Sequence, residues 1–578
     1  MNKIFNIFKI TGLVKFLSLI SLKGKKNLKI LFFFMFVASL LEILSIGILI
    51  PLINFIFNPN STSNIFNLQE FGIINFFANF DYVNLILFFI FIIYLIKSLF
   101  IVFYQYFNAK VLLNMSVDIK TLLFENYLNK DYLFHLNNNS SLLIRNVQNE
   151  IDVLMANYVS PILVFSLTVL NIVFICSFLL YYSFVSSLLV VIIFGITGLT
   201  LNFSVRKILI VIGERRKFFA FSILKNLRQS FTLIKEIKIN SKEKYFSNKL
   251  FSDNSMMAKL GIKRTVLGSL PRIIFEFLFI IIVLSSIYYM NSSNINFENF
   301  LSLLTVYAIA AFRIMPSLNS LSTSYQKIKF GSPALSTIYE ALKDRNVQDV
   351  YFTNDKIQNF KFKKQLLLKE ISFTYPFEKK PVFQDINLKI KKGEIIGIIG
   401  DNASGKSTLI DLICGLLKPS AGKIIIDDEE LINVSAYQKI IGYVNQQIYL
   451  IDGNIKSNIA FGINEEDINL DKIKKVMSIT GLDSSLNENN FIRENGKNIS
   501  GGQKQKIAIA RALYDDPEIL ILDEATSAMD TNAEKDFTEI VFQQKIDKTI
   551  IIISHRLQAL DKCNAIYKIN NKGISKIA

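Results

Sequence analysis

The residues whose chemistry is clearest lie between Glu394 and Ile410. Gly400 and Gly405 bracket a loop with the spacing G-x-x-x-x-G-K-S, which follows an Ile-rich run that predicts a buried strand. Such a loop wraps a phosphate with backbone N–H groups, and a helix that begins at Lys406 adds its positive end. A glycine-rich turn before an ordinary helix is the alternative, but strand, loop and helix stand in the required order. The pattern therefore predicts a nucleoside triphosphate site.

The side chains of this P-loop complete the predicted site. The Lys406 ammonium can reach the β- and γ-phosphates, and the Ser407 hydroxyl suits Mg²⁺. We predict that ATP is held by Gly400, Asp401, Asn402, Ala403, Ser404, Gly405, Lys406, Ser407 and Thr408.

A second apolar run, from Pro517 to Leu522, ends in the carboxylates Asp523 and Glu524. After a P-loop, this arrangement is typical of the Walker B motif. We predict that Asp523 holds Mg²⁺ through water and that Glu524 polarises the attacking water.

A further phosphate site is predicted at Ser500, Gly501, Gly502 and Gln503, which precede a helical pattern. The chain has only one P-loop. The simplest arrangement is a homodimer in which each ATP lies between the P-loop of one subunit and the Ser-Gly-Gly-Gln of the other.

Length and composition place this site in a larger membrane protein. The chain has 578 residues, 51% of them hydrophobic, and a mean hydropathy of +0.37, with the apolar runs gathered before Gln326. The net charge of +17 invites a nucleic-acid partner, but the Lys and Arg residues lie largely beside the apolar runs, so an anionic bilayer explains them better. The three cysteines have no spacing that suggests a disulfide framework or a zinc site.

The apolar runs predict six membrane spans. Residues 1–29 predict an interfacial amphipathic helix, with a signal peptide as the alternative. The loops 58–82 and 291–299 lack Lys and Arg, so we place them outside, and a tight outer turn is expected near Tyr181 and Tyr182. The predicted spans are 31–57, 83–107, two within 152–206, 271–290 and 300–325.

Two polar segments, 108–157 and 207–262, are too long for plain connectors. We predict helices that continue below the membrane and turn at Asp131–Asn139 and near Ile234–Lys244, where they can touch the nucleotide domain. Solvated loops are the alternative.

With six spans upstream, these motifs resemble the ABC exporter half-transporters, and the resemblance covers nearly the whole chain. It implies an α-helical transmembrane domain followed by an α/β P-loop nucleotide-binding domain. The corresponding boundaries are 30–330 for the transmembrane domain, 331–366 for a linker and first strand, and 367–578 for the ATPase domain. It also implies ATP and Mg²⁺ as cofactors, a homodimer in a bacterial inner membrane, and an ATPase domain in the cytoplasm.

The same resemblance assigns roles to single residues. Tyr375 resembles the aromatic that stacks on adenine, Gln446 the Q-loop glutamine, which also contacts the metal, and His555 the switch histidine. Ser527 to Asp530 resembles the D-loop, and Glu494 stands where exporters place an acidic residue that faces the coupling loops. His135 is interpreted as structural.

Charged residues inside the predicted spans are the only guide to the cargo, because such residues are costly in a bilayer. Lys97, Arg272 and Arg313 can form a cationic substrate site, or they can pair with Glu42 and Glu276 and hold helices together.

The stretches around Arg272 and Arg313 resemble PglK-type flippases, which move polyprenyl-pyrophosphate-linked oligosaccharides, although Lys97 stands where that family has an arginine. The resemblance implies a flippase for a lipid-linked glycan or a related anionic lipid. An exporter of peptides, drugs or lipid A-like lipids is the alternative. The six spans exclude a soluble ABC ATPase acting on DNA or ribosomes, and a gated channel or receptor would not need the complete hydrolytic set.

Overall fold

The computed structural model describes most of the chain. The described residues are 10–47, 82–182, 184–292, 297–343, 361–482, 486–525, 548–554, 560–561, 563–570 and 572–577. The chain divides into two compact units, of which the first comprises residues 1–130 and 135–351 and the second comprises residues 131–134 and 352–578.

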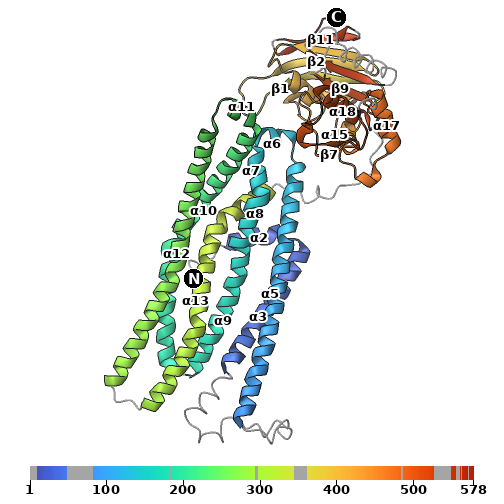
Figure 1. Cartoon of the computed structure of the whole chain (residues 1–578). Coiled ribbons are helices and arrows are strands. Elements are labelled where there is room, and N and C mark those ends of the chain that lie inside the picture. Colours follow the sequence, from blue (N-terminus) through green and yellow to red (C-terminus); the bar gives the residue numbers. More distant parts are fainter. Residues whose placement is uncertain are drawn as a thin grey trace. The chain divides into compact units, whose positions relative to one another are not determined.

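The first unit is helical among its described residues, and its long helices lie side by side (Figure 1). The helices are α2 (Ile10–Leu19), α3 (Leu22–Gly47), α5 (Tyr82–Leu128), α7 (Ser140–Arg145), η4 (Asn146–Glu150), α8 (Ile151–Leu154), η5 (Met155–Val159), α9 (Ser160–Tyr182), α10 (Phe184–Thr232), α11 (Ile234–Ile239), α12 (Glu243–Ser292) and α13 (Phe297–Lys343). The helix α3 packs against α5 and α9, and α10 packs against α12 and α13.

Five of these helical stretches are long and apolar enough to cross a membrane, within the part of the chain that the structure describes. They run over Leu22–Ser45, Leu87–Leu128, Ser140–Ser177, Val191–Thr232 and Glu243–Ser285. The sixth predicted span lies in α13, whose side chains up to residue 313 are outside the described part. Many apolar side chains on α3 and α5, such as Phe33 and Phe91, are exposed in the single chain, as expected for helices that meet lipid.

Several helix bounds bear on the sequence predictions. The helix α9 ends at Tyr182 and α10 begins at Phe184, where a tight turn was expected. The basic residues from Lys23 to Lys29 belong to α3, so the first spanning helix begins earlier than its apolar run. The short helices α6 (Tyr132–Asn137) and α11 stand at the two predicted cytoplasmic turns. The predicted outer loop 58–82 lies outside the described residues, except for Tyr82, which begins α5.

The second unit contains two main sheets. A four-stranded antiparallel sheet has the order β2-β1-β4-β5, and a six-stranded sheet has the order β12-β11-β3-β10-β9-β6, parallel except for β12. The strands are β1 (Gln365–Phe373), β2 (Phe383–Lys391), β3 (Ile395–Gly400), β4 (Ala421–Ile426), β5 (Glu429–Glu430), β6 (Ile441–Val444), β9 (Ile519–Asp523), β10 (Thr549–Ile553), β11 (Ala565–Asn570) and β12 (Gly573–Lys576).

Helices and short elements complete this unit. They are α14 (Lys406–Ile413), α15 (Val434–Gln438), β7 (Gly453–Asn454), α16 (Ile455–Ile459), η6 (Glu465–Asp467), α17 (Leu470–Ile479), β8 (Phe491–Ile492), η7 (Glu494–Gly496) and α18 (Gly501–Leu513). The whole architecture confirms the predicted fold class, a helical transmembrane domain followed by an α/β nucleotide-binding domain.

The central strands β3, β9 and β10 are apolar except at strand ends, where Asp523 and Thr549 stand, because both faces of the six-stranded sheet are covered. In β9, Leu520 and Leu522 enter the core formed with α16, α17 and α18, whereas Ile519 and Ile521 enter the core formed with α14 and the antiparallel sheet. A parallel sheet buried on both faces requires such continuous apolar runs. This burial fixes the ends of β3 and β9, from which the P-loop and the Walker B carboxylates emerge.

A buried ionic cluster joins the helices of the first unit. Glu150 is fully buried, and its Oε2 lies 2.6 Å from Nη2 of Arg216 on α10. Its Oε1 lies 3.7 Å from Nε of Arg145 and has no hydrogen-bond partner. The guanidinium of Arg145 also donates to the Asn146 side chain and to the Lys217 carbonyl. One carboxylate therefore compensates the buried Arg145 and the largely buried Arg216.

We expect Glu150→Gln to destabilise the first unit, because two largely buried guanidinium groups would lose their counter-charge. Breaking a buried ion pair by removing one partner costs about 3–5 kcal/mol. The melting temperature of the detergent-purified chain measures this effect. Glu214→Gln removes a half-exposed carboxylate that pairs with Lys217, and it should change the melting temperature little. Equal melting temperatures for the two variants would contradict a stabilising role of the cluster.

Candidate functional site

The predicted P-loop connects β3 to α14 and has the backbone shape that such a loop needs. Gly405 has φ of +103° and Ala403 has φ of +62°. A Cβ at Gly400 would lie 2.6 Å from Oγ of Ser404 and 3.2 Å from the Ile569 carbonyl. Any side chain at Gly400 would therefore fill the space inside the loop.

The polar groups of the loop fit a polyphosphate. The Lys406 ammonium lies over the loop and donates to the carbonyls of Gly400 (2.8 Å) and Asp401 (3.0 Å). The Ser404 hydroxyl is buried without a hydrogen-bond partner, and α14 begins at Lys406 with no side-chain cap on its first N–H groups. Orphan N–H groups, an unpaired hydroxyl and an ammonium together are suited to a phosphate anion.

Tyr375 contacts the first turn of α14. Its hydroxyl is 3.1 Å from Oγ1 of Thr408, and its ring meets Phe373 edge to face at 4.9 Å between centroids. The ring predicted to stack on adenine is thereby tied to the helix that begins at the P-loop. The structure brings together Tyr375, Thr408 and the loop residues from Gly400 to Ser407.

The predicted Walker B carboxylates stand at the carboxyl end of β9. Asp523 is 8% exposed and accepts a hydrogen bond from the Tyr443 hydroxyl at 3.3 Å. Burial raises the pKa of Asp523, whereas the Tyr443 hydrogen bond and the Lys406 charge lower it. Glu524 has φ of +48°, and its Oε2 accepts from Nε2 of Gln446 at 2.6 Å.

This donor set fits Mg²⁺ bound together with a nucleotide. The described residues contain no group of three or more His, Cys, Asp or Glu side chains that could hold a metal alone. Magnesium is usually bound by one or two carboxylates plus substrate phosphates, and it retains several waters. Asp523, Ser407 and Gln446 would supply the protein groups, with the nucleotide as the remaining ligand.

The Ser-Gly-Gly-Gln segment forms the start of α18. Oγ of Ser500 accepts from the Gln503 N–H (3.2 Å), and the Gln503 side chain accepts from the Ser500 N–H (2.9 Å). This capping box fixes the segment, with Gly501 and Gly502 in the first turn of the helix. Glu494, nearby in η7, pairs with Lys497 at 2.5 Å.

The structure does not describe the side chains of three predicted site residues. Asp530 with the rest of the D-loop, and His555, lie outside the described residues. Arg313 is part of α13, but its side chain is outside the described part.

Two of the three cations predicted in the spans, Lys97 and Arg272, are paired with carboxylates. The Lys97 ammonium, 6% exposed, lies 2.7 Å from Oε2 of Glu42 and donates to Oγ of Ser45 at 2.9 Å. Nε of Arg272 lies 2.7 Å from Oε1 of Glu276 one turn along α12, and both side chains are exposed in the single chain. Of the two alternatives that the sequence offered, a cationic substrate site or pairing with Glu42 and Glu276, the structure shows the pairing for Lys97 and Arg272.

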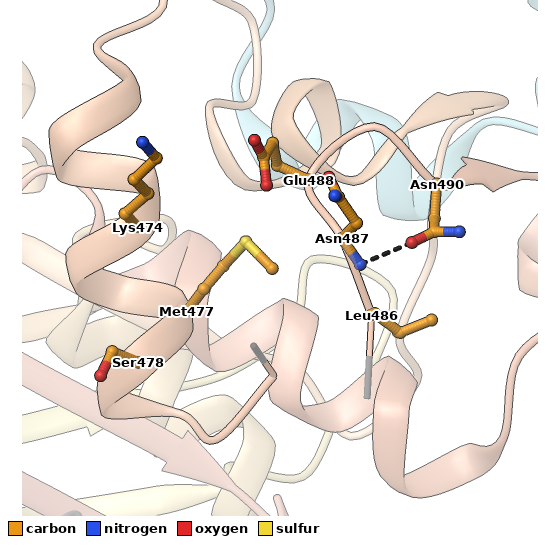
Figure 2. Close-up of a pocket in the computed structure, with 7 residues that line it drawn as sticks. All are labelled: Lys474, Met477, Ser478, Leu486, Asn487, Glu488 and Asn490. Carbon is orange, nitrogen blue, oxygen red and sulfur yellow. Dashed lines mark hydrogen bonds between the residues drawn. The ribbon is translucent and has the colours of Figure 1, made fainter. Parts of the chain in front are cut away.

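A separate pocket of about 590 Å³ lies in the second unit between α17 and the loop 486–490. Figure 2 shows its lining, formed by Lys474, Met477, Ser478, Leu486, Asn487, Glu488 and Asn490. The loop's polar groups are engaged: the Asn487 N–H donates to the Asn490 side chain, and the carbonyls of Glu488 and Asn490 accept from the first N–H groups of α16. None of the predicted nucleotide residues lines this pocket.

Sequence reasoning missed two groups beside the Walker B carboxylate. Tyr443 stands on β6, where it alternates with buried residues, and the partly buried Asp411 stands on α14 between the buried Ile410 and Leu412. Burial, followed by the nearby Asp523 charge, raises the pKa of Asp411 to about 6. A carboxylate amid the apolar residues of a core helix was the available signal for Asp411.

We expect Asp411→Asn to stabilise the second unit at about pH 7.5 more than at about pH 5. The pKa of Asp411 is raised from 3.8 to about 6 in the folded state. Ionisation of this carboxyl therefore lowers the free energy of unfolding, with no effect below about pH 3.8 and the full effect above about pH 6. Melting curves of the chain at both pH values measure the difference. The exposed Asp515→Asn is the matched control, and a gain that is equal at both pH values would contradict this assignment.

Comparisons with known proteins agree with this geometry. The chain matches the ABC transporter transmembrane region over residues 28–313 and the ABC transporter family over residues 383–527. A bacterial Atm1-family ABC exporter with ATP bound has the same fold, with a TM-score of 0.78 over 95% of both chains at 16% identity.

Several relatives are described as lipid A-core flippases. The ATP-dependent lipid A-core flippase 2 of Colwellia psychrerythraea is 32% identical over 46% of each chain. The ATP-dependent lipid A-core flippase of Cupriavidus pinatubonensis is 24% identical over 81% of this chain and 79% of its own. The chain spans less than half the length of the relatives that it matches at 32% identity. Since the two family matches together span most of the chain, it belongs to the ABC transporter family, with a transmembrane region followed by an ABC ATPase domain.

Proposed function

We propose that two copies of this chain form an ATP-driven exporter that flips an anionic, phosphate-bearing lipid across a bacterial inner membrane. ATP and Mg²⁺ bind at the P-loop, Asp523 holds the metal through water, and Glu524 polarises the attacking water. His555 and Asp530 complete the site, and the Ser500 segment of the second copy closes it over the phosphates. The presence of one P-loop and one Ser-Gly-Gly-Gln segment in the chain supports the dimer.

The single observation that carries the cargo proposal is the exposed charge on α12. The side chains of Arg272 and Glu276 stand at the start of the apolar half of α12, and they are 69% and 54% exposed in the single chain. A charged pair that faced lipid at this place would be costly. The helix face that bears Arg272 therefore lines an aqueous cavity or the second subunit, where a guanidinium can bind a phosphate bidentately.

Lys97 has a different environment and, we propose, a different role. It is buried and held by Glu42, Ser45 and the ring of Tyr94, whose centroid lies 5.4 Å from the ammonium. This pair holds α3 against α5. Arg272, together with Arg313, is then the cation for the lipid phosphate, and Lys97 is a packing residue.

Two lipids have the required head-group chemistry. The relatives described as lipid A-core flippases support a lipid A-like cargo. The residues around Arg272 and Arg313 support a polyprenyl-pyrophosphate-linked oligosaccharide instead. We favour the lipid A-like cargo, because relatives described in that way match 46% of the chain at 31–32% identity and 81% of it at 24% identity.

Reconstitution in proteoliposomes tests the function. Lipid A-core, a polyprenyl-pyrophosphate oligosaccharide and an amphipathic peptide are added in separate arms, and both ATPase stimulation and flipping are measured. The Glu524→Gln variant is the control without hydrolysis. Stimulation and flipping by a phosphate-bearing lipid support the proposal, whereas stimulation by the peptide alone would favour the alternative exporter.

We expect Arg272→Gln and Lys97→Met to fail in different ways. Arg272→Gln should reduce lipid-stimulated ATPase by roughly tenfold, as expected for a lost hydrogen bond to a charged group, while basal ATPase and melting temperature stay unchanged. Lys97→Met should lower the melting temperature, because removing one partner of a largely buried ion pair costs about 3–5 kcal/mol.

The matched double variants separate charge from packing. Glu42→Gln with Lys97→Met should recover the melting temperature that Lys97→Met loses. Glu276→Gln with Arg272→Gln should remain unstimulated. Normal stimulation by lipid in the Arg272→Gln variant would overturn its role as a substrate-binding residue.

A further inference from the structure

Asp523 occupies a site where a charged carboxylate needs support. It is 8% exposed, and two further carboxyl groups, Asp411 and Glu524, interact with it electrostatically. Among the described residues, one side-chain hydrogen bond reaches it, from the Tyr443 hydroxyl to Oδ2 at 3.3 Å. A buried carboxylate near like charges is held in a fixed orientation only where a donor engages it.

The sheet register explains why Tyr443 reaches this carboxylate. The strands β6 and β9 are parallel neighbours, and Tyr443 is the partner of Ile521. Because side chains alternate along a strand, Asp523 stands two residues on and on the same face as Ile521. The ring of Tyr443 reaches diagonally from β6 to Asp523 on β9. At 3.3 Å the hydrogen bond is long, as is common in sites that tighten only when the ligand binds.

We infer that Tyr443 is a positioning residue for the metal carboxylate: its hydroxyl holds Oδ2 of Asp523 and so leaves Oδ1 for Mg²⁺ or a water of the ion. This role rests on the proposed use of Mg²⁺ by the ATPase domain. The hydroxyl is a neutral donor, so it orients the carboxylate without competing with the ion for charge. A lysine at this position would neutralise Asp523 and weaken its attraction for the metal.

The test is Tyr443→Phe, which keeps the ring and removes only the hydroxyl. It is made in the Glu524→Gln background, so that binding is measured without hydrolysis. A fluorescent ATP analogue is titrated onto the full chain at a series of Mg²⁺ concentrations, and once in EDTA. Tyr449→Phe is the matched control, because the Tyr449 hydroxyl donates to Gln447 and not to Asp523.

The half-saturating Mg²⁺ concentration should rise roughly two- to tenfold in Tyr443→Phe, the loss expected for one hydrogen bond. Binding in EDTA and the melting temperature should stay unchanged, which separates an effect on the metal from a loss of packing. If nucleotide binding by the Glu524→Gln parent depends on Mg²⁺ and Tyr443→Phe leaves the half-saturating Mg²⁺ concentration unchanged, the inference alone is overturned. Nucleotide binding that is independent of Mg²⁺ in the parent protein would overturn both the inference and the proposed metal.

The ion environment gives a second readout. With Mn²⁺ in place of Mg²⁺ and ATP bound, the electron paramagnetic resonance spectrum of the ion should differ between Tyr443→Phe and its parent, because the carboxylate oxygen is less well ordered. Tyr449→Phe should give the parent spectrum. Identical spectra for Tyr443→Phe and the parent would contradict the positioning role.

Discussion

The nucleotide site depends on the burial of β3, β9 and β10 between two apolar cores. Alternate residues of these strands enter opposite cores, so the strands cannot shift by one residue without exchanging their faces. Their carboxyl ends are therefore fixed with respect to one another. The P-loop leaves β3, and the Walker B carboxylates leave β9, both at that edge. Loops at the carboxyl ends of parallel strands are the usual place for ligands in such sheets.

The two units differ in whether their buried polar groups have partners. In the nucleotide unit several polar groups are left available at the edge of the sheet, among them the buried Ser404 hydroxyl and the first N–H groups of α14. In the helical unit the buried charges are paired, as in the Glu150 cluster and the pair of Lys97 with Glu42. A low-dielectric interior makes an unpaired charge costly, so available polar groups mark a site for a ligand and paired charges mark packing. By the same reasoning, the exposed pair of Arg272 and Glu276 on α12 requires water or a second subunit around it.

The fold was predictable from the sequence because its signals are local. The apolar runs predict the spanning helices, and the order of strand, glycine loop and helix predicts the P-loop. The sequence offered both a substrate site and pairing with a carboxylate for Lys97, and it could not decide between them, because the outcome depends on how α3 and α5 are rotated against each other. Tyr443 was missed for a related reason, since its contact with Asp523 arises from the neighbouring order of β6 and β9, which are distant in sequence. The first spanning helix begins before its apolar run because lysines are compatible with a helix that continues into an interface.

A mixture of two inactive variants tests the central claim, that ATP is bound between the P-loop of one copy and the Ser-Gly-Gly-Gln of another. Lys406→Ala damages the P-loop and Ser500→Arg damages the second phosphate site, so neither variant alone has an intact composite site. Co-expressed with different affinity tags and purified over both, the mixed dimer should hold one intact site and one doubly damaged site. ATP hydrolysis should return in the mixed dimer, while each variant alone remains inactive. A mixed dimer as inactive as its parents, or full activity in a monomer, would contradict this claim.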